Sequence, residues 1–264
     1  MPGNAAVKNT ARVILKGMWP KLIACTFLGI AVAFIGIYAI SAVSLLVFGA
    51  VWMEFLALIC YFLLIFMPLS LGILRFVWRQ INDADDDIEI VFHYFSSAAQ
   101  YFKSLLFTVT FGIKLLISAV LAFFPYLAVR YALYSSADFL SEQMEMRLLF
   151  LSAIFWLCGM IFFIILSVRY YISPLLFVGC SDIEVSEVMH LSKLISRKTA
   201  GSYIVLVLGM IGWILLSAFG ITMIYTVPYL LLTYAVHCRY AIYYYNHRIR
   251  LNEETSFPEF RSSF

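Results

Sequence analysis

The long uncharged stretches of the sequence constrain the fold more than any other feature. Residues 199–238 contain no Asp, Glu, Lys or Arg over 40 positions, and residues 22–53 are uncharged as well. Charged residues make up 12% of the 264 positions and hydrophobic residues 64%, whereas roughly a quarter of the residues in a soluble domain are charged. A soluble fold cannot cover that much apolar surface. The sequence therefore predicts an all-α, polytopic membrane protein.

A transmembrane helix needs about 20 consecutive apolar residues. Glu54 separates the first two uncharged runs, and Ser217–Gly220 is a plausible turn within the last one. The apolar runs predict a single membrane domain over 1–264, built as a transmembrane helical bundle with about six spans in three hairpins. We expect these spans near 22–48, 55–74, 104–129, 148–169, 202–219 and 224–244.

The distribution of Lys and Arg predicts the orientation. If six spans are assumed, fifteen of the eighteen basic residues fall on one side. Arg130 and Arg147 fall on the other side, and Lys114 lies inside a span. Because cytoplasmic loops are enriched in Lys and Arg, we expect both termini in the cytoplasm, with residues 250–264 forming a short cytoplasmic tail.

Each hairpin is expected to follow a cytoplasmic amphipathic helix. These helices are predicted over 5–18, 88–101 and 184–198, with polar side chains on one face and apolar side chains on the other. The second and third follow Asp-Asp-Ile-Glu and Ser-Asp-Ile-Glu sequences, at 86–89 and 181–184. Both sequences have the pattern of a capping box, in which the fourth residue is a glutamate.

Two segments also share a motif. Pro125-Tyr126-Leu127 is followed four residues later by Tyr131-Ala132, and Pro228-Tyr229-Leu230 is followed in the same way by Tyr234-Ala235. This repeated motif favours an internal duplication in which both units have the same orientation in the membrane. Independent use of the same residues to kink two helices explains it equally well.

Charged residues at membrane depth are the first candidates for function. Lys114 lies about 15 Å along a helix that starts at Leu105, which is near the bilayer midplane. A charge there is usually functional or paired, and Ser118, Thr108 and Thr110 are candidate acceptors. Alternatively, the span starts later and the Lys114 side chain snorkels to the interface.

Two arginines and three small residues complete the candidate set. Arg130 and Arg169 are expected at the outer and inner interfaces, where they could contact lipid or another anion, as Lys114 could. Gly29, Ala33 and Gly36 form a small-residue stripe that suits close helix packing. The packing is either internal to the monomer or the face of a dimer.

The sequence offers no catalytic, cofactor-binding or metal-binding motif. Glycine loops for phosphate, H-E-x-x-H and G-x-S-x-G are all missing. The four histidines are expected near cytoplasmic boundaries, and the acidic residues around 83–89 fit a solvated turn better than a cation site. We therefore expect no enzyme, no cofactor and no nucleic-acid partner.

Several local motifs carry a family resemblance. They include Tyr171-Ile172-Ser173-Pro174, Ile211-Gly212-Trp213 and Val227-Pro228-Tyr229, together with Ala11-Arg12 and Pro68-Leu69 nearer the N-terminus. The chain resembles a bacterial family of six-span membrane proteins, domain of unknown function nine-seven-five. The resemblance implies a multi-pass protein of the bacterial plasma membrane and brings no catalytic residue.

These observations predict a non-enzymatic integral plasma-membrane protein that organises protein partners or lipids at the inner leaflet. Its expected partners are membrane lipids, including anionic ones; a protein partner and a homo-oligomer stay open. The alternative is a small transporter or channel with a polar path at Lys114.

Overall fold

The computed structural model describes residues 3–47, 51–82, 87–135, 142–180 and 183–252, and in these ranges the fold is all-α. The α-helices are α1 (Asn4–Val47), α2 (Val51–Tyr61), α3 (Met67–Ile81), α4 (Ala98–Ser135), α5 (Glu142–Ser167), α6 (Ser173–Gly179), α7 (Val185–Leu208), α8 (Ile211–Ser217) and α9 (Gly220–Asn252). A π-helix, η1 (Phe62–Phe66), joins α2 to α3, and two 3₁₀-helices, η2 (Ile88–Phe95) and η4 (Val168–Tyr170), precede α4 and α6.

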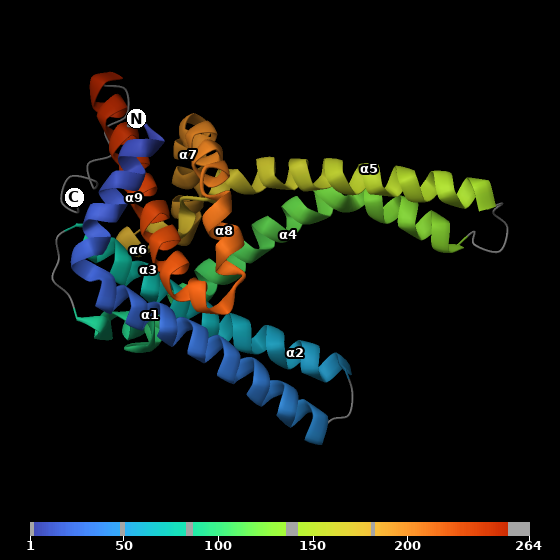
Figure 1. Ribbon diagram of the computed structural model, residues 1–264, viewed down its shortest axis with the longest axis horizontal. Coiled ribbons are helices and arrows are strands. Elements are labelled where there is room, and N and C mark those ends of the chain that lie inside the picture. Colours follow the sequence, from blue (N-terminus) through green and yellow to red (C-terminus); the bar gives the residue numbers. More distant parts are fainter. Residues whose placement is uncertain (1–2, 48–50, 83–86, 136–141, 181–182, 253–264) are drawn as a thin grey trace.

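The helices form a compact head from which two hairpins diverge (Figure 1). We call the α1–α2 pair the first hairpin and the α4–α5 pair the second hairpin. The head contains the start of α1, together with α3, η2, α6, α7 and α9. The start of α1 and the end of α9 lie close together, on the side of the head that faces away from the hairpin tips (Figure 1).

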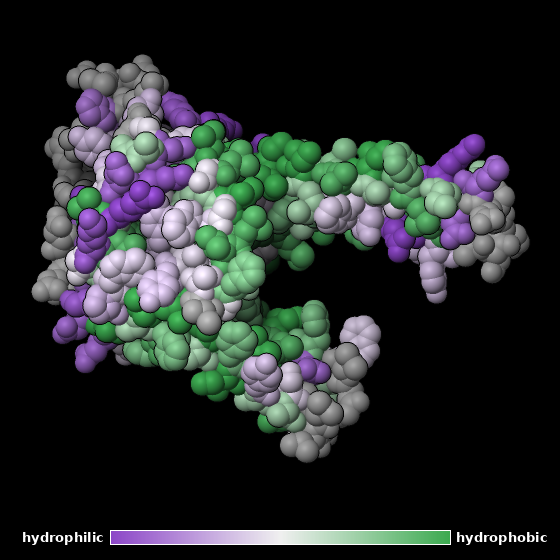
Figure 2. Space-filling view, viewed as in Figure 1, coloured by the Kyte–Doolittle hydropathy of each residue, from purple (hydrophilic) through white to green (hydrophobic). Residues whose placement is uncertain are grey.

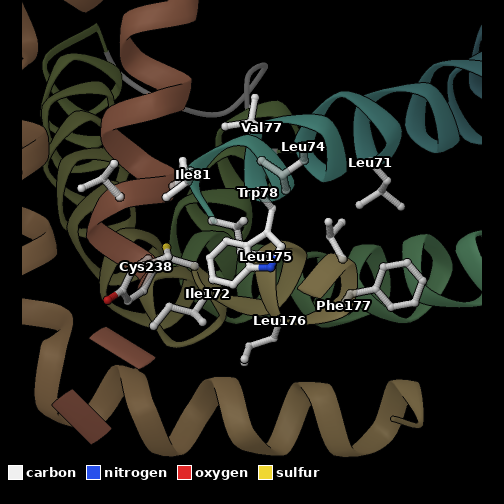
Figure 3. Packing of buried hydrophobic residues seen from close by; sticks show 14 of the residues in the cluster. Leu71, Leu74, Val77, Trp78, Ile81, Ile172, Leu175, Leu176, Phe177 and Cys238 are labelled. Carbon is white, nitrogen blue, oxygen red and sulfur yellow. The ribbon is translucent and has the colours of Figure 1, made fainter. Parts of the chain in front are cut away.

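The core of the head is built on α3, α6 and α9 (Figure 3). Ile172, Leu175 and Leu176 on α6 and its preceding turn are at most 2% exposed. Phe177 stacks on Phe107 of α4, with ring centroids 4.3 Å apart. Burial of these side chains joins the head to the base of the second hairpin, because Phe107 lies in the first part of α4.

Four stretches of the described residues are long and apolar enough to cross a membrane. They are Asn4–Val43, Trp52–Ile81, Ala98–Ser135 and Gln143–Gly179; α7 and α8, bent by 56°, make a fifth if they count as one span. The span expected at 224–244 lies in α9, which is not among them. The described residues thus support four or five spans in place of the expected six, because tyrosine, threonine and His237 lower the hydropathy of α9.

Two of the predicted amphipathic segments are the first parts of longer helices. Segment 5–18 opens α1 and segment 184–198 opens α7. Their apolar faces are buried in the head: Val7 and Val188 are both 0% exposed. Protein packing therefore removes these apolar faces from water.

Segment 88–101 is not one helix. Its first part is the 3₁₀-helix η2, and α4 begins only at Ala98. Ser96 donates its hydroxyl to the His93 carbonyl, and the Ser97 hydroxyl accepts the Gln100 amide at 3.3 Å. Such serine bonds compete with the helical backbone bonds and fix a new N-terminus at Ser97.

The two predicted capping boxes also differ from the structure. The residue that precedes η2 is Asp87, and the N-cap of α7 is Glu184, whose side chain makes no capping hydrogen bond. Glu184 thus stands at the N-cap where the box required it at the third helical position. Asp86, Ser181 and residues 253–264 of the expected tail lie outside the described residues.

Candidate functional site

An apolar cavity of about 510 Å³ lies where the two hairpins meet the head. Helices α1, α3, α4 and α9 contribute to its wall, together with η1 and the start of α6. In the space-filling view, hydrophobic surface covers the sides of the opening between the hairpins (Figure 2). The lining residues include Ile30, Phe34, Phe66, Leu71, Phe107, Phe111, Pro174 and Leu231.

The hydroxyl groups in the cavity wall are bonded to the backbone. Thr26 donates to the Leu22 carbonyl at 2.8 Å and Thr108 donates to the Ser104 carbonyl at 2.9 Å. Ser70 and Tyr234 likewise donate to backbone carbonyls. Because these donors are already used, the wall offers mainly dispersion contacts, which suit an apolar ligand.

The small-residue stripe of α1 shapes both the cavity and the first hairpin. Gly29 and Ala33 line the cavity. Gly36 faces the ring of Tyr61, where any Cβ would overlap the ring, and the Tyr61 hydroxyl donates to the Val32 carbonyl at 2.5 Å. At Gly36 the stripe therefore packs inside the monomer and brings α1 close to its own hairpin partner.

Lys114 is half-buried one turn beyond the cavity. Its Nζ lies 5.9 Å from the centroid of the Tyr170 ring, within the range of a cation–π contact. Among the described residues, the Lys114 ammonium makes no hydrogen bond to the three expected hydroxyls, Ser118, Thr108 and Thr110; its contact is with the Tyr170 ring. Lys114 thus sits at the head end of the second hairpin, level with Tyr170.

The two candidate arginines lie at opposite ends of the second hairpin. Arg169 is exposed in η4, beside Tyr170 and so near Lys114. Arg130 is exposed on α4, sixteen residues beyond Lys114 or about 24 Å along the helix. The structure therefore brings Lys114 and the Arg169 backbone to one level and keeps Arg130 apart.

A buried polar cluster between the turn after η4, α7 and α9 was not found from the sequence. Tyr171 and Thr199 share a hydrogen bond of 2.8 Å, and Tyr171 lies 3.4 Å from Nε2 of His237, which is 0% exposed. The ring of Tyr203 stacks on Tyr171 with centroids 4.0 Å apart. His237 was expected at a boundary, because sequence position alone does not show that α9 is enclosed by other helices. The cluster ties three elements of the head together.

No candidate metal centre is found among the described residues, where no group of three or more His, Cys, Asp or Glu side chains could hold an ion. Asp83, Asp85 and Asp86 of the acidic sequence lie outside them. The apolar cavity and the cation at its edge are therefore the features of this structure that fit a ligand best.

Comparison with known proteins supports the family assignment. A protein family of unknown function matches residues 1–248. No curated protein and no solved structure matches the chain. With its long apolar helices, the chain is a membrane protein. It belongs to the family described as protein of unknown function DUF975.

Proposed function

We propose that this protein is a non-enzymatic integral membrane protein that organises lipids, and that it does so by taking an acyl chain into the cavity between its hairpins. The main observation that supports the proposal is the apolar wall of that cavity. Its volume falls within the roughly 300–1,000 Å³ of small-ligand sites. Lipid is the apolar ligand most available to an opening between two membrane-exposed hairpins.

The exposed surface of the second hairpin supports a lipid environment. The second hairpin exposes large apolar side chains, with Phe124 on α4 66% exposed and Ile161 on α5 62% exposed. Exposed apolar area of this extent is stable only in a bilayer or against a partner. An acyl chain can therefore enter the opening between the hairpins without crossing water.

The alternative of a transporter with a polar path at Lys114 has weaker support. Such a path needs polar walls, and the cavity wall is apolar. Lys114 lies at the edge of the cavity and is not part of its lining. The geometry therefore favours lipid binding over solute passage.

The proposal includes a bacterial plasma-membrane location with both termini cytoplasmic. The Lys and Arg asymmetry supports it, and the start of α1 and the end of α9 share one side of the head (Figure 1). Single cysteines placed at residues 95 and 145 of a cysteine-free variant test it. The first should be protected from an impermeant thiol reagent in intact cells and the second labelled; the reverse pattern contradicts the orientation.

Filling the cavity tests lipid binding. Ala33→Phe adds a ring inside the cavity, and Ala128→Phe adds the same ring to an exposed position of α4. Native mass spectrometry of the detergent-solubilised protein, with palmitoyl-oleoyl phosphatidylethanolamine as the probe, counts bound lipids. Ala33→Phe should lose at least one bound lipid, whereas Ala128→Phe should bind as the wild type does. Equal binding by all three proteins would reject the cavity as a lipid site.

A further inference from the structure

We propose that the lipid held by this cavity is anionic and that Lys114 binds its headgroup, an inference that rests on the proposed function. It names the class of lipid and assigns a specificity-determining residue.

Two elements place Lys114 at the edge of the cavity. Phe111 lines the cavity, and Lys114 follows it by three residues on α4, a rise of about 4.5 Å. Pro174 also lines the cavity, and Tyr170, whose ring contacts the Lys114 ammonium, precedes it by four residues. The cation therefore lies close to the apolar wall: one helical turn along α4 from Phe111, and beside a ring that lies four residues before Pro174.

The Lys114 ammonium has no anionic partner within the described ranges. The side chain contacts the Tyr170 ring, and no hydrogen bond joins the ammonium to the Ser118 hydroxyl, which donates to the Lys114 carbonyl. A half-buried cation in apolar surroundings without a counter-ion is costly. An anion from outside the chain would therefore be stabilised at this position.

An anionic amphiphile has both an apolar chain for the cavity and a negative charge for the Lys114 ammonium. Its acyl chain occupies the apolar cavity while its phosphate stays at the edge, beside Lys114. A zwitterionic lipid fills the cavity equally well but carries a compensating cation in its headgroup. The expected selectivity is about fivefold, since one basic residue contributes about 1 kcal/mol to binding of anionic lipid.

Competition between two lipids tests the assignment. Equal amounts of palmitoyl-oleoyl phosphatidylglycerol and phosphatidylethanolamine are offered to the full-length protein, and native mass spectrometry gives the ratio bound. The wild type and Lys114→Arg should both prefer phosphatidylglycerol about fivefold. Lys114→Gln should bind both lipids about equally, with total lipid unchanged. Arg147→Gln, which removes an exposed arginine of α5, should keep the preference.

The outcomes separate this inference from the proposed function. If Lys114→Gln keeps the preference for phosphatidylglycerol, the headgroup assignment is overturned while the cavity stays a lipid site. Loss of both lipids in Lys114→Gln also overturns it, because Lys114 would then support the cavity rather than select the headgroup. An additional polypeptide mass in place of lipid contradicts a lipid occupant altogether. Size-exclusion chromatography of each variant confirms that it is folded.

Discussion

The repeated Pro-Tyr-Leu motif occupies two opposite environments in this protein. In the segment 125–132 of α4, Pro125 and Ala132 are exposed and Tyr131 is 74% exposed. At the equivalent positions of the segment 228–235 of α9, Pro228 is buried, Tyr234 is half-buried and Ala235 is 0% exposed. The same residues thus face the surroundings in a hairpin and the interior in the head. Local sequence determines the helix in both cases, and its neighbours determine the environment.

The same contrast holds for whole helices. The span that contains α5 has the highest mean hydropathy of the candidate spans, and only about a tenth of its most apolar part is buried. Helix α9 is less apolar than the candidate spans but contributes Leu232, Ala235 and Val236 to the core. Lipid tails are as apolar as leucine, so no hydrophobic force drives the most apolar helix inward. Polar and small side chains are stabilised more by the protein interior than by lipid, because there they pack closely and form hydrogen bonds.

Replacing the tyrosine of each motif should give the largest difference in stability between the α9 and α4 variants. Tyr229 packs on Trp213 of α8, with ring centroids 5.2 Å apart, and lies 6.0 Å from the Arg12 guanidinium. Tyr229→Ala should destabilise the protein by about 3 kcal/mol or more, and Tyr126→Ala, at a half-buried position, by about 1 kcal/mol. Thermal unfolding followed by fluorescence-detected size-exclusion chromatography measures both. Equal losses would mean that the two environments are alike.

Enlarging the alanine of each motif should give an intermediate difference in stability between the α9 and α4 variants. Ala235→Leu inserts three carbons into a position with no exposed surface and should cost about 1–3 kcal/mol. Ala132→Leu adds the same atoms to an exposed position and should change the stability by less than about 0.5 kcal/mol. The same melting measurement applies. A well-tolerated leucine at residue 235 would show that the head is loosely packed there.

Acidification should give the smallest effect and should act on the head. His93 is half-buried in η2, and its pKa is lowered below 6.5 by desolvation and by the charges of Arg75 and Arg79. The unfolded chain therefore takes up a proton at a higher pH than the folded chain does, and the His93 contribution to stability, present above pH 6.5, is lost as the pH falls. The second hairpin contains no histidine.

The variant His93→Gln checks this sign. Its melting temperature should fall less than that of the wild type between pH 7.5 and pH 5.5, whereas Ala132→Leu should keep the wild-type pH dependence. A His93→Gln variant that is more sensitive to acid than the wild type would reverse the assignment.

The candidate site shows the same division between sequence and structure. Lys114 was identified from its position in an apolar run, because a cation in such a run is unusual whatever the fold. Gly29 and Gly36 were identified as packing residues from their place in a small-residue stripe, which is also a local feature of the sequence. The cavity was not predicted, since its wall joins residues as distant as Thr26 and Leu231. His237 was expected at a membrane boundary, because the sequence does not show which helices surround α9.

What the sequence determined by itself is the class of protein: all-helical and apolar over long stretches. Those properties follow from composition and local periodicity, which neighbouring residues alone establish. Only the tertiary structure decided which apolar faces meet protein and which stay exposed. It also decided that the amphipathic starts of α1 and α7 turn inward, and that Lys114 stands beside a cavity. The physical reason is that an apolar side chain loses contact with water equally well against lipid or against protein, so its hydropathy cannot distinguish the two.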